Sequence, residues 1–91
     1  MDEQSRPILA RGVRLRDDPI TGEPILLFPE GVLPLDDVAH DILLCCTGEM
    51  SLEDIIKSLS REYEADYDMV HRDVCECLLH LRQQMLIVLA K

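Results

Sequence analysis

The side chains of this chain that could hold a metal ion are three histidines and four cysteines. Cys75 and Cys77 stand two residues apart, and on a helix such side chains point about 200° apart, so they cannot bind the same ion. His71 and Cys75, four residues apart, could do so. Zinc motifs draw their specificity from paired Cys-x-x-Cys ligands, which this sequence lacks. We therefore expect no metal site and no cofactor, with Cys45 and Cys46 as small hydrophobic residues at the edge of the core.

Groups that could act in catalysis are also few. His40 and His80 have no serine or cysteine nucleophile at a recognisable motif spacing. The sequence has no glycine-rich phosphate loop and no paired-carboxylate signature. The acidic residues are scattered along expected helix faces, where exposure to water explains them. The sequence thus predicts a binding protein and not an enzyme.

Net charge restricts the partners and the compartment. Eighteen acidic and nine basic residues give a formal charge of −9, which repels nucleic acids and anionic lipid head groups. The longest apolar run, residues 85–90, is far too short to span a bilayer. Asp2 and Glu3 stand where an export signal would carry Lys or Arg. We expect a cytoplasmic protein with free thiols, and neither nucleic acid nor membrane as a partner.

The elements that must position any binding site fit in one small domain, because the chain has only 91 residues. No internal repeat or low-complexity tract interrupts it. We assign residues 7–91 to a single recognition domain and residues 1–6 to a flexible tail.

The first third of the chain reads as strands. Residues 8–16 and 24–28 flank a stretch that is dense in residues that form turns. Pro29 and Gly31 then predict a tight hairpin into a third strand, residues 32–35.

At residue 36 the hydrophobic period changes from that of a strand to that of a helix. Asp36 or Asp37 can cap a first helix, which Gly48 would end. Ser51, followed three residues later by Asp54, is a variant of the capping box and predicts the start of a second helix.

A third helix is expected after residues 64–68. Its apolar stripe continues to about Gln84, and residues 86–89 then read as a short extended segment. Strands followed by three helices predict an α+β fold with a three-stranded antiparallel sheet.

The second and third strands are unusual because their apolar runs, residues 25–28 and 32–35, are unbroken. A sheet with one wet face should alternate apolar and polar residues, so both faces of this sheet require cover. Pro34 removes one hydrogen-bond donor, which is tolerable at a sheet edge and awkward in the middle. An exposed edge beside an apolar groove is the geometry with which a guest peptide adds itself as an extra strand. The third strand is therefore the expected binding edge.

An ordered set of residues, spread from about Pro7 to Leu89, matches a known family. It comprises Leu27-Phe28-Pro29-Glu30-Gly31, Leu35-Asp36, Ala39, Gly48, Ile55, Leu59 and Asp73-Val74. In this set the chain resembles the PqqD family, the peptide chaperones of pyrroloquinoline quinone biosynthesis. It departs from the family pattern where Thr47 replaces the usual Asp and Asp36 the frequent Asn. Both positions belong to helix caps or turns, so they affect local stability more than function.

The resemblance implies a winged-helix-like domain of three strands and three helices. It also implies that the chain binds the precursor peptide PqqA and presents it to PqqE, a radical SAM enzyme that joins a glutamate and a tyrosine of the peptide. In family members the peptide lies along the third strand, in the cleft between that strand and the third helix. Carried onto this sequence, the implied contacts are Val32, Leu33 and Leu35 on the strand and Val74, Cys77, Leu78 and Leu81 on the helix.

Some of the implied helix contacts have a second explanation. Val74, Leu78 and Leu81 form a stripe at helical spacing, and such a stripe is usually part of the core. Val32 and Leu33 are stronger candidates, because one of the two must face away from the helices if the strand is regular.

Two other binding functions compete with this interpretation. A winged-helix-like domain commonly reads DNA through its third helix, but here Asp68, Asp73 and Glu76 outnumber Arg72 and Arg82. An acyl or peptidyl carrier protein is also small, acidic and helical. Carriers share an Asp-Ser-Leu attachment site, whereas this chain offers only Lys-Ser-Leu at residues 57–59, and its strand-rich first third argues against a carrier.

Overall fold

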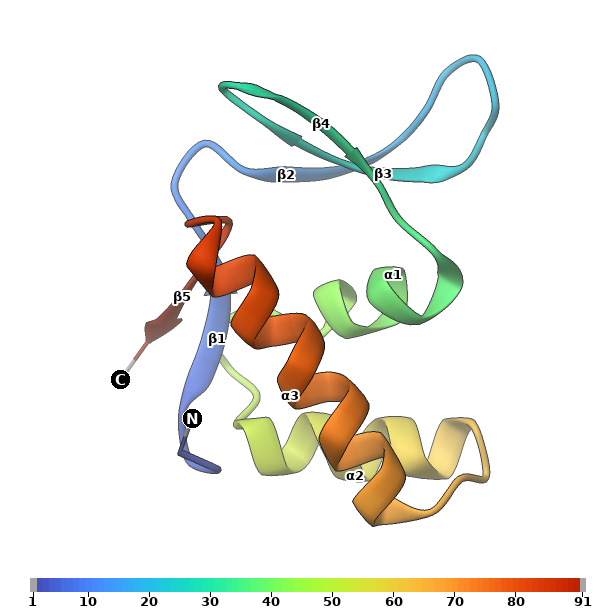
Figure 1. Cartoon of the computed structure of the whole chain (residues 1–91), viewed down its shortest axis with the longest axis vertical. Helices are drawn as coiled ribbons and strands as arrows, with labels where there is room; N and C mark the ends of the chain where they lie inside the picture. The colour runs from blue at the N-terminus through green and yellow to red at the C-terminus, as the bar shows by residue number, and fades with distance from the viewer. Residues whose placement is uncertain (1, 91) are drawn as a thin grey trace.

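The computed structural model describes residues 2–90, in which five strands and three helices follow one another (Figure 1). Met1 and Lys91, the outer residues of the predicted tail and domain, lie outside the described residues. The strands are β1 (Arg6–Leu9), β2 (Arg14–Asp17), β3 (Pro24–Phe28), β4 (Gly31–Pro34) and β5 (Ile87–Ala90). The helices are α1 (Asp37–Leu44), α2 (Leu52–Glu62) and α3 (Tyr67–Gln83).

The larger sheet is antiparallel, has the strand order β2-β3-β4, and lies at one end of the molecule with the helices beneath it (Figure 1). A tight hairpin joins β3 to β4, because Phe28 pairs with Gly31 across two intervening residues. Leu15, Leu26 and Leu33 lie opposite one another on the three strands. The predicted α+β fold, with a three-stranded antiparallel sheet and three helices, is confirmed.

The first predicted strand, residues 8–16, is wrong in its extent. It is divided into β1 and β2 by a turn, in which the Val13 N–H donates to the Ala10 carbonyl at 3.0 Å. Gly12 lies in this turn with φ +84°, a conformation that glycine adopts without steric cost. The chain therefore changes direction where the apolar pattern alone suggested continuity.

The two ends of the chain form a second, two-stranded sheet that the sequence does not predict. β1 pairs with β5 in antiparallel fashion, with Arg6 opposite Ala90 and Leu9 opposite Ile87. The extended segment predicted at residues 86–89 is confirmed, since β5 covers most of it. This pairing places the N-terminal strand β1 beside the C-terminal strand β5 (Figure 1).

The segment before β1 is bonded to the start of α2. The carbonyls of Glu3 and Ser5 accept hydrogen bonds from the N–H groups of Glu53 and Leu52, at 3.0 and 2.8 Å. These donors belong to the first turn of a helix, where no carbonyl of the helix itself is available. The flexibility expected of residues 1–6 stays a prediction. These two hydrogen bonds would have to break for the segment to move freely.

Side-chain caps begin the first two helices as predicted. Asp36 Oδ1 accepts from the Ala39 N–H at 2.7 Å, and Ser51 Oγ accepts from the Asp54 N–H at 3.1 Å. The predicted end of the first helix at Gly48 is wrong, because α1 ends at Leu44. Gly48 instead donates its N–H to the carbonyl of Pro7, in a turn with φ +85°.

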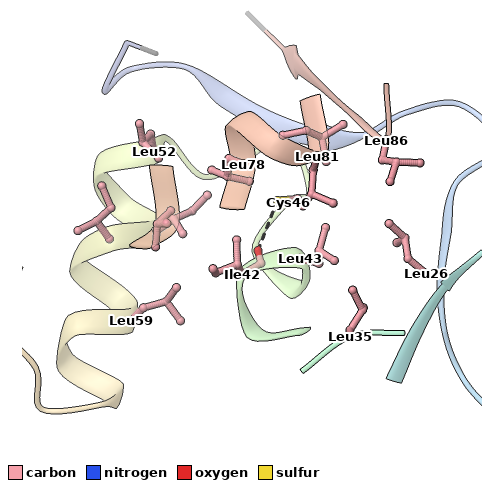
Figure 2. Close-up of a cluster of buried hydrophobic side chains, with 14 of the residues drawn as sticks. Leu26, Leu35, Ile42, Leu43, Cys46, Leu52, Leu59, Leu78, Leu81 and Leu86 are labelled. Atoms are coloured by element: carbon pink, nitrogen blue, oxygen red, sulfur yellow. Dashed lines mark hydrogen bonds between the residues drawn. The ribbon is translucent and has the colours of Figure 1, made fainter. Parts of the chain in front are cut away.

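The core lies between the sheet and the helices, where leucine and isoleucine side chains from both layers point toward one another (Figure 2). Cys46 belongs to it, and burial raises the pKa of its thiol to about 12. The Cys46 thiol contacts the Ile42 carbonyl at 3.4 Å. No described helix is both long and apolar enough to cross a membrane. Residues at most 2% exposed include Leu26, Ile42, Leu43, Leu52, Ile55, Ile56, Leu59, Val74, Leu78 and Ile87.

Candidate functional site

β4 is an edge strand whose outer side meets no other strand within residues 2–90. Its pairing with β3 determines which main-chain groups face outward, because hydrogen-bonded and non-hydrogen-bonded pairs alternate in an antiparallel ladder. Leu35 donates its N–H to Pro24, so the pairs containing Leu33 and Leu35 are bonded to β3. The N–H and carbonyl of Val32 and the carbonyl of Pro34 therefore point away from β3. This edge offers one donor and two acceptors to a guest strand.

The side chains of β4 point alternately toward and away from the helices. Leu33 packs against the core, and Leu35, which follows the strand, is buried. Val32 points to the other face and is 53% exposed. Of the three strand residues implied by the family resemblance, Leu33 and Leu35 thus lie on the helix side of this edge and Val32 lies on the solvent side.

The four implied contacts on α3 separate into two classes. Val74, Leu78 and Leu81 are at most 3% exposed and belong to the core, the second explanation offered for them above. Such side chains can support a groove from below. Cys77 is half-buried and lines a surface hollow, and burial together with the Asp36 charge raises the pKa of its thiol. Cys77 is therefore a neutral, mainly apolar contact at neutral pH.

A hollow of about 510 Å³ lies where β4 approaches the end of α3. Leu33 is the implied site residue that lines it. The sequence does not indicate the rest of its lining, because these residues come from a turn, a hairpin and a helix end that only the tertiary structure brings together. They are Arg11, Val13, Phe28, Pro29, Glu30, Gln84, Met85 and Leu86.

A second hollow of about 360 Å³ lies between α1 and α3, one helical turn earlier along α3. Its lining includes Cys77 and His80, and His80 lies 3.3 Å from Gln84 of the first hollow. Asp36, Asp73 and Glu76 also line it. We refer to the two hollows together as the groove beside β4: its first part is mainly apolar and contains Arg11 and Glu30, and its second part is acidic and contains His80.

Met85, at the apolar end, is held in an unusual conformation. Its φ is +61°, and its side chain is 81% exposed. The Leu86 N–H donates to Leu81 at 2.9 Å, and the Met85 N–H donates to Arg82 at 3.0 Å, which makes a Schellman motif at the end of α3. Glycine is the usual residue at such a position, since any other pays a steric penalty.

Glu64 ends α2 in the same way, with φ +51° and the Ala65 N–H bonded to Ser60 at 3.0 Å. Two helices of one small domain therefore end on strained residues. Glu64 lines none of the described hollows, whereas Met85 presents an apolar side chain at the groove. Residues in such conformations cluster at functional sites, which makes Met85 a candidate residue of the groove.

No group of three or more metal-binding side chains gathers among residues 2–90. His71 and Cys75, the pair that could share an ion, lie 3.9 Å apart, and His71 also approaches Glu3 at 3.8 Å. All four cysteines are free thiols.

Comparison with known proteins gives a consistent answer. Residues 23–87 match the family model described as coenzyme PQQ synthesis protein D, PqqD. A PqqA binding protein of Rhodopseudomonas palustris is 41% identical over 81 residues, covering 89% of this chain and 79% of the relative. A PqqA binding protein of Xanthomonas axonopodis is 39% identical and covers 91% and 90% of the two chains.

Two solved structures share the fold. The solution structure of the PqqD part of Methylobacterium extorquens PqqCD, described as a stand-alone recognition element for ribosomally made, modified peptides, gives a TM-score of 0.77. It is 34% identical and covers 90% of this chain and 87% of that one. The crystal structure of PqqD from Xanthomonas campestris gives a TM-score of 0.59 at 36% identity, covering 94% and 96%.

These names describe binding and recognition rather than catalysis, which confirms, at the level of the family, the prediction of a non-enzymatic module. The resemblance drawn from the ordered residues is confirmed as well. The match to the family model covers most of the chain, and the two relatives match it over 79% and 90% of their own length. This chain therefore belongs to the PqqD family.

Proposed function

We propose that this chain is a peptide chaperone that binds the precursor peptide PqqA by strand addition along β4. It then presents the peptide to the radical SAM enzyme PqqE, which joins a glutamate and a tyrosine side chain. The observation that carries the proposal is the unpaired edge of β4 beside a groove of mixed apolar and charged character. Relatives with 38–41% identity that bear the name PqqA binding protein support the choice of peptide.

Strand addition fits the groups that the edge offers. A guest strand bonded to Val32 on both its N–H and its carbonyl would satisfy main-chain groups that otherwise bind only water. Alternate side chains of the guest would then point toward the helices and enter the hollows beside Leu33 and Cys77. In this arrangement Val74, Leu78 and Leu81 support the groove without contacting the guest.

Charge supports a peptide over a nucleic acid in this groove. Asp36, Asp73 and Glu76 line the acidic end, where phosphates would be repelled. Arg11 at the other end could pair with a carboxylate of the peptide. The proposed complex needs no cofactor and no membrane, and four free thiols suit the reducing cytoplasm as its compartment.

The experiment that tests peptide binding is an NMR titration of the isotope-labelled chain with PqqA. We expect the amide signals of Val32, Leu33 and Cys77 to shift together, with Met69 at the far end of α3 as an internal reference that stays in place. Shifts confined to surfaces remote from β4 would contradict strand addition, and the absence of any shift would contradict the function. Presentation is tested separately, by the rate at which PqqE crosslinks PqqA with and without this chain.

Substitution of the strained helix ends should separate binding from stability. We expect Met85→Gly and Glu64→Gly each to raise the free energy of unfolding by about 0.5–1 kcal/mol, since relief of the steric penalty exceeds the entropy gained by the unfolded chain. Met85→Gly should nevertheless weaken PqqA binding about fivefold, because an apolar contact is lost. Denaturant unfolding and a peptide titration measure the two effects. Equal peptide affinity in both variants would remove Met85 from the site.

A further inference from the structure

A third hollow, which no residue of β4 lines, lies where the end of α2 meets the starts of α1 and α3. It measures about 120 Å³, enough for a single side chain rather than a peptide strand. Its mouth carries three large apolar residues that are roughly half exposed, Val38, Tyr63 and Met69. Buried residues of α2 and α3 form its floor, namely Leu59, Val70 and Val74.

Carboxylates from all three helices lie at or near the mouth of this apolar socket. Asp73 lines it directly, and Asp41 accepts a hydrogen bond from the Tyr63 hydroxyl at its rim. That bond, followed by burial and the charges of Asp41, Glu62 and Asp37, raises the pKa of Tyr63 to about 12. The tyrosine thus stays a neutral hydrogen-bond donor toward Asp41 at neutral pH.

None of these rim carboxylates is neutralised within the described chain. The ion pairs among residues 2–90 are Lys57 with Glu53 and His71 with Glu3, neither of which reaches the rim. No lysine or arginine lines the socket, and Arg61, next to Glu62 in sequence, makes no ion pair. An apolar centre with an uncompensated acidic rim requires a partner of opposite character.

We infer that this socket docks a protein partner that inserts one aliphatic or thioether side chain flanked by lysine or arginine residues. A second copy of this chain does not fit, because its net charge of −9 and its own acidic rim would repel the first. A nucleic acid is repelled for the same reason. The inference rests on the proposed function, in that the partner meant is the enzyme that receives the peptide. No residue of β4 lines the socket, but the socket shares Val38 and Asp73 with the second hollow, so the enzyme and the peptide would lie next to each other on the chain.

Matched variants test the docking surface without disturbing the fold. Glu62→Lys reverses a rim charge at the last residue of α2, where a cation suits the helix dipole. Its control is Glu23→Lys, the same charge change in an exposed loop beside β3. Met69→Gln removes the apolar mouth, and its control is Leu79→Gln, an exposed residue of α3 that lines none of the described hollows.

The affinity of each variant for the PqqE holoenzyme, and separately for PqqA, is then measured at low and high salt. We expect Glu62→Lys and Met69→Gln to weaken enzyme binding about tenfold, with both controls near the unmodified chain and peptide affinity unchanged in all four. Enzyme binding should also weaken as salt is raised. Unchanged enzyme affinity in both test variants, or an equal loss in the controls, would overturn the socket and leave the proposed function standing. An unmodified chain that binds PqqA but not the enzyme would overturn both the socket and presentation, while peptide binding would stand.

Discussion

Replacing Val32 by proline should weaken PqqA binding about 10- to 100-fold. The N–H of Val32 is the one donor that the edge of β4 presents, because Pro34 has none and the N–H of Leu33 faces β3. Proline removes this donor and leaves a carbonyl of the guest without a partner, at a cost of about 1–3 kcal/mol. Isothermal titration calorimetry with PqqA measures the change in affinity.

The fold should tolerate this proline. Residue 32, like Pro34 two residues later, belongs to a pair that is not hydrogen-bonded to β3. A proline there therefore breaks no bond between β3 and β4. Val32→Ala is the matched control, since it shortens the same exposed side chain and keeps the N–H. If both variants bind equally well, the guest does not bond to this edge, and recognition must depend on side chains alone.

Replacing Leu33 by glutamate should reduce PqqA affinity about 100-fold, the largest effect of a single side chain that we expect. Leu33 is the β4 residue that both packs on the core and lines the hollow at the end of α3, so a charge there must be desolvated when a guest side chain enters. Part of the effect will be loss of stability, about 1–3 kcal/mol. Peptide titration and denaturant unfolding must therefore be measured together.

Leu15→Glu provides the control for stability. Leu15 occupies the same row of the sheet as Leu33, on the opposite edge strand, and both are partly buried against the core with Leu26 between them. We expect the two variants to lose similar stability and only Leu33→Glu to lose the peptide. Similar peptide affinities in the two would show that the groove beside β4 is not where PqqA binds.

The local signals in the sequence were sufficient for most elements. The side chains of Asp36 and Ser51 cap their helices as their types and positions predict, and the β3–β4 hairpin forms at Pro29 and Gly31. The outer face of the sheet needs less cover from other elements than its apolar runs suggested. Arg14 and Arg16 share the outer face with Leu27 and Ile25, and the aliphatic stems of arginine can shield such residues from water.

Long-range pairing is the part that the sequence could not supply. Nothing in the types of Leu9 or Ile87 indicates that they are opposite one another, since pairing over such a separation depends on the whole chain. The same limit applies to the groove. Leu33 could be chosen from its strand, whereas Arg11 and Met85 reach the hollow only because a turn and a helix end converge there.

The pairing of β1 with β5 also makes the molecule suitable for rearrangement of its connectivity. Arg6 and Ala90 are neighbours, and both chain ends lie far from β4 (Figure 1). A short glycine-serine tether could therefore join the ends, and new ends could be opened in the exposed turn around Thr21 and Gly22. A circular permutant of this design would keep every strand pair, and cargo fused before β1 or after β5 would leave the recognition edge unobstructed.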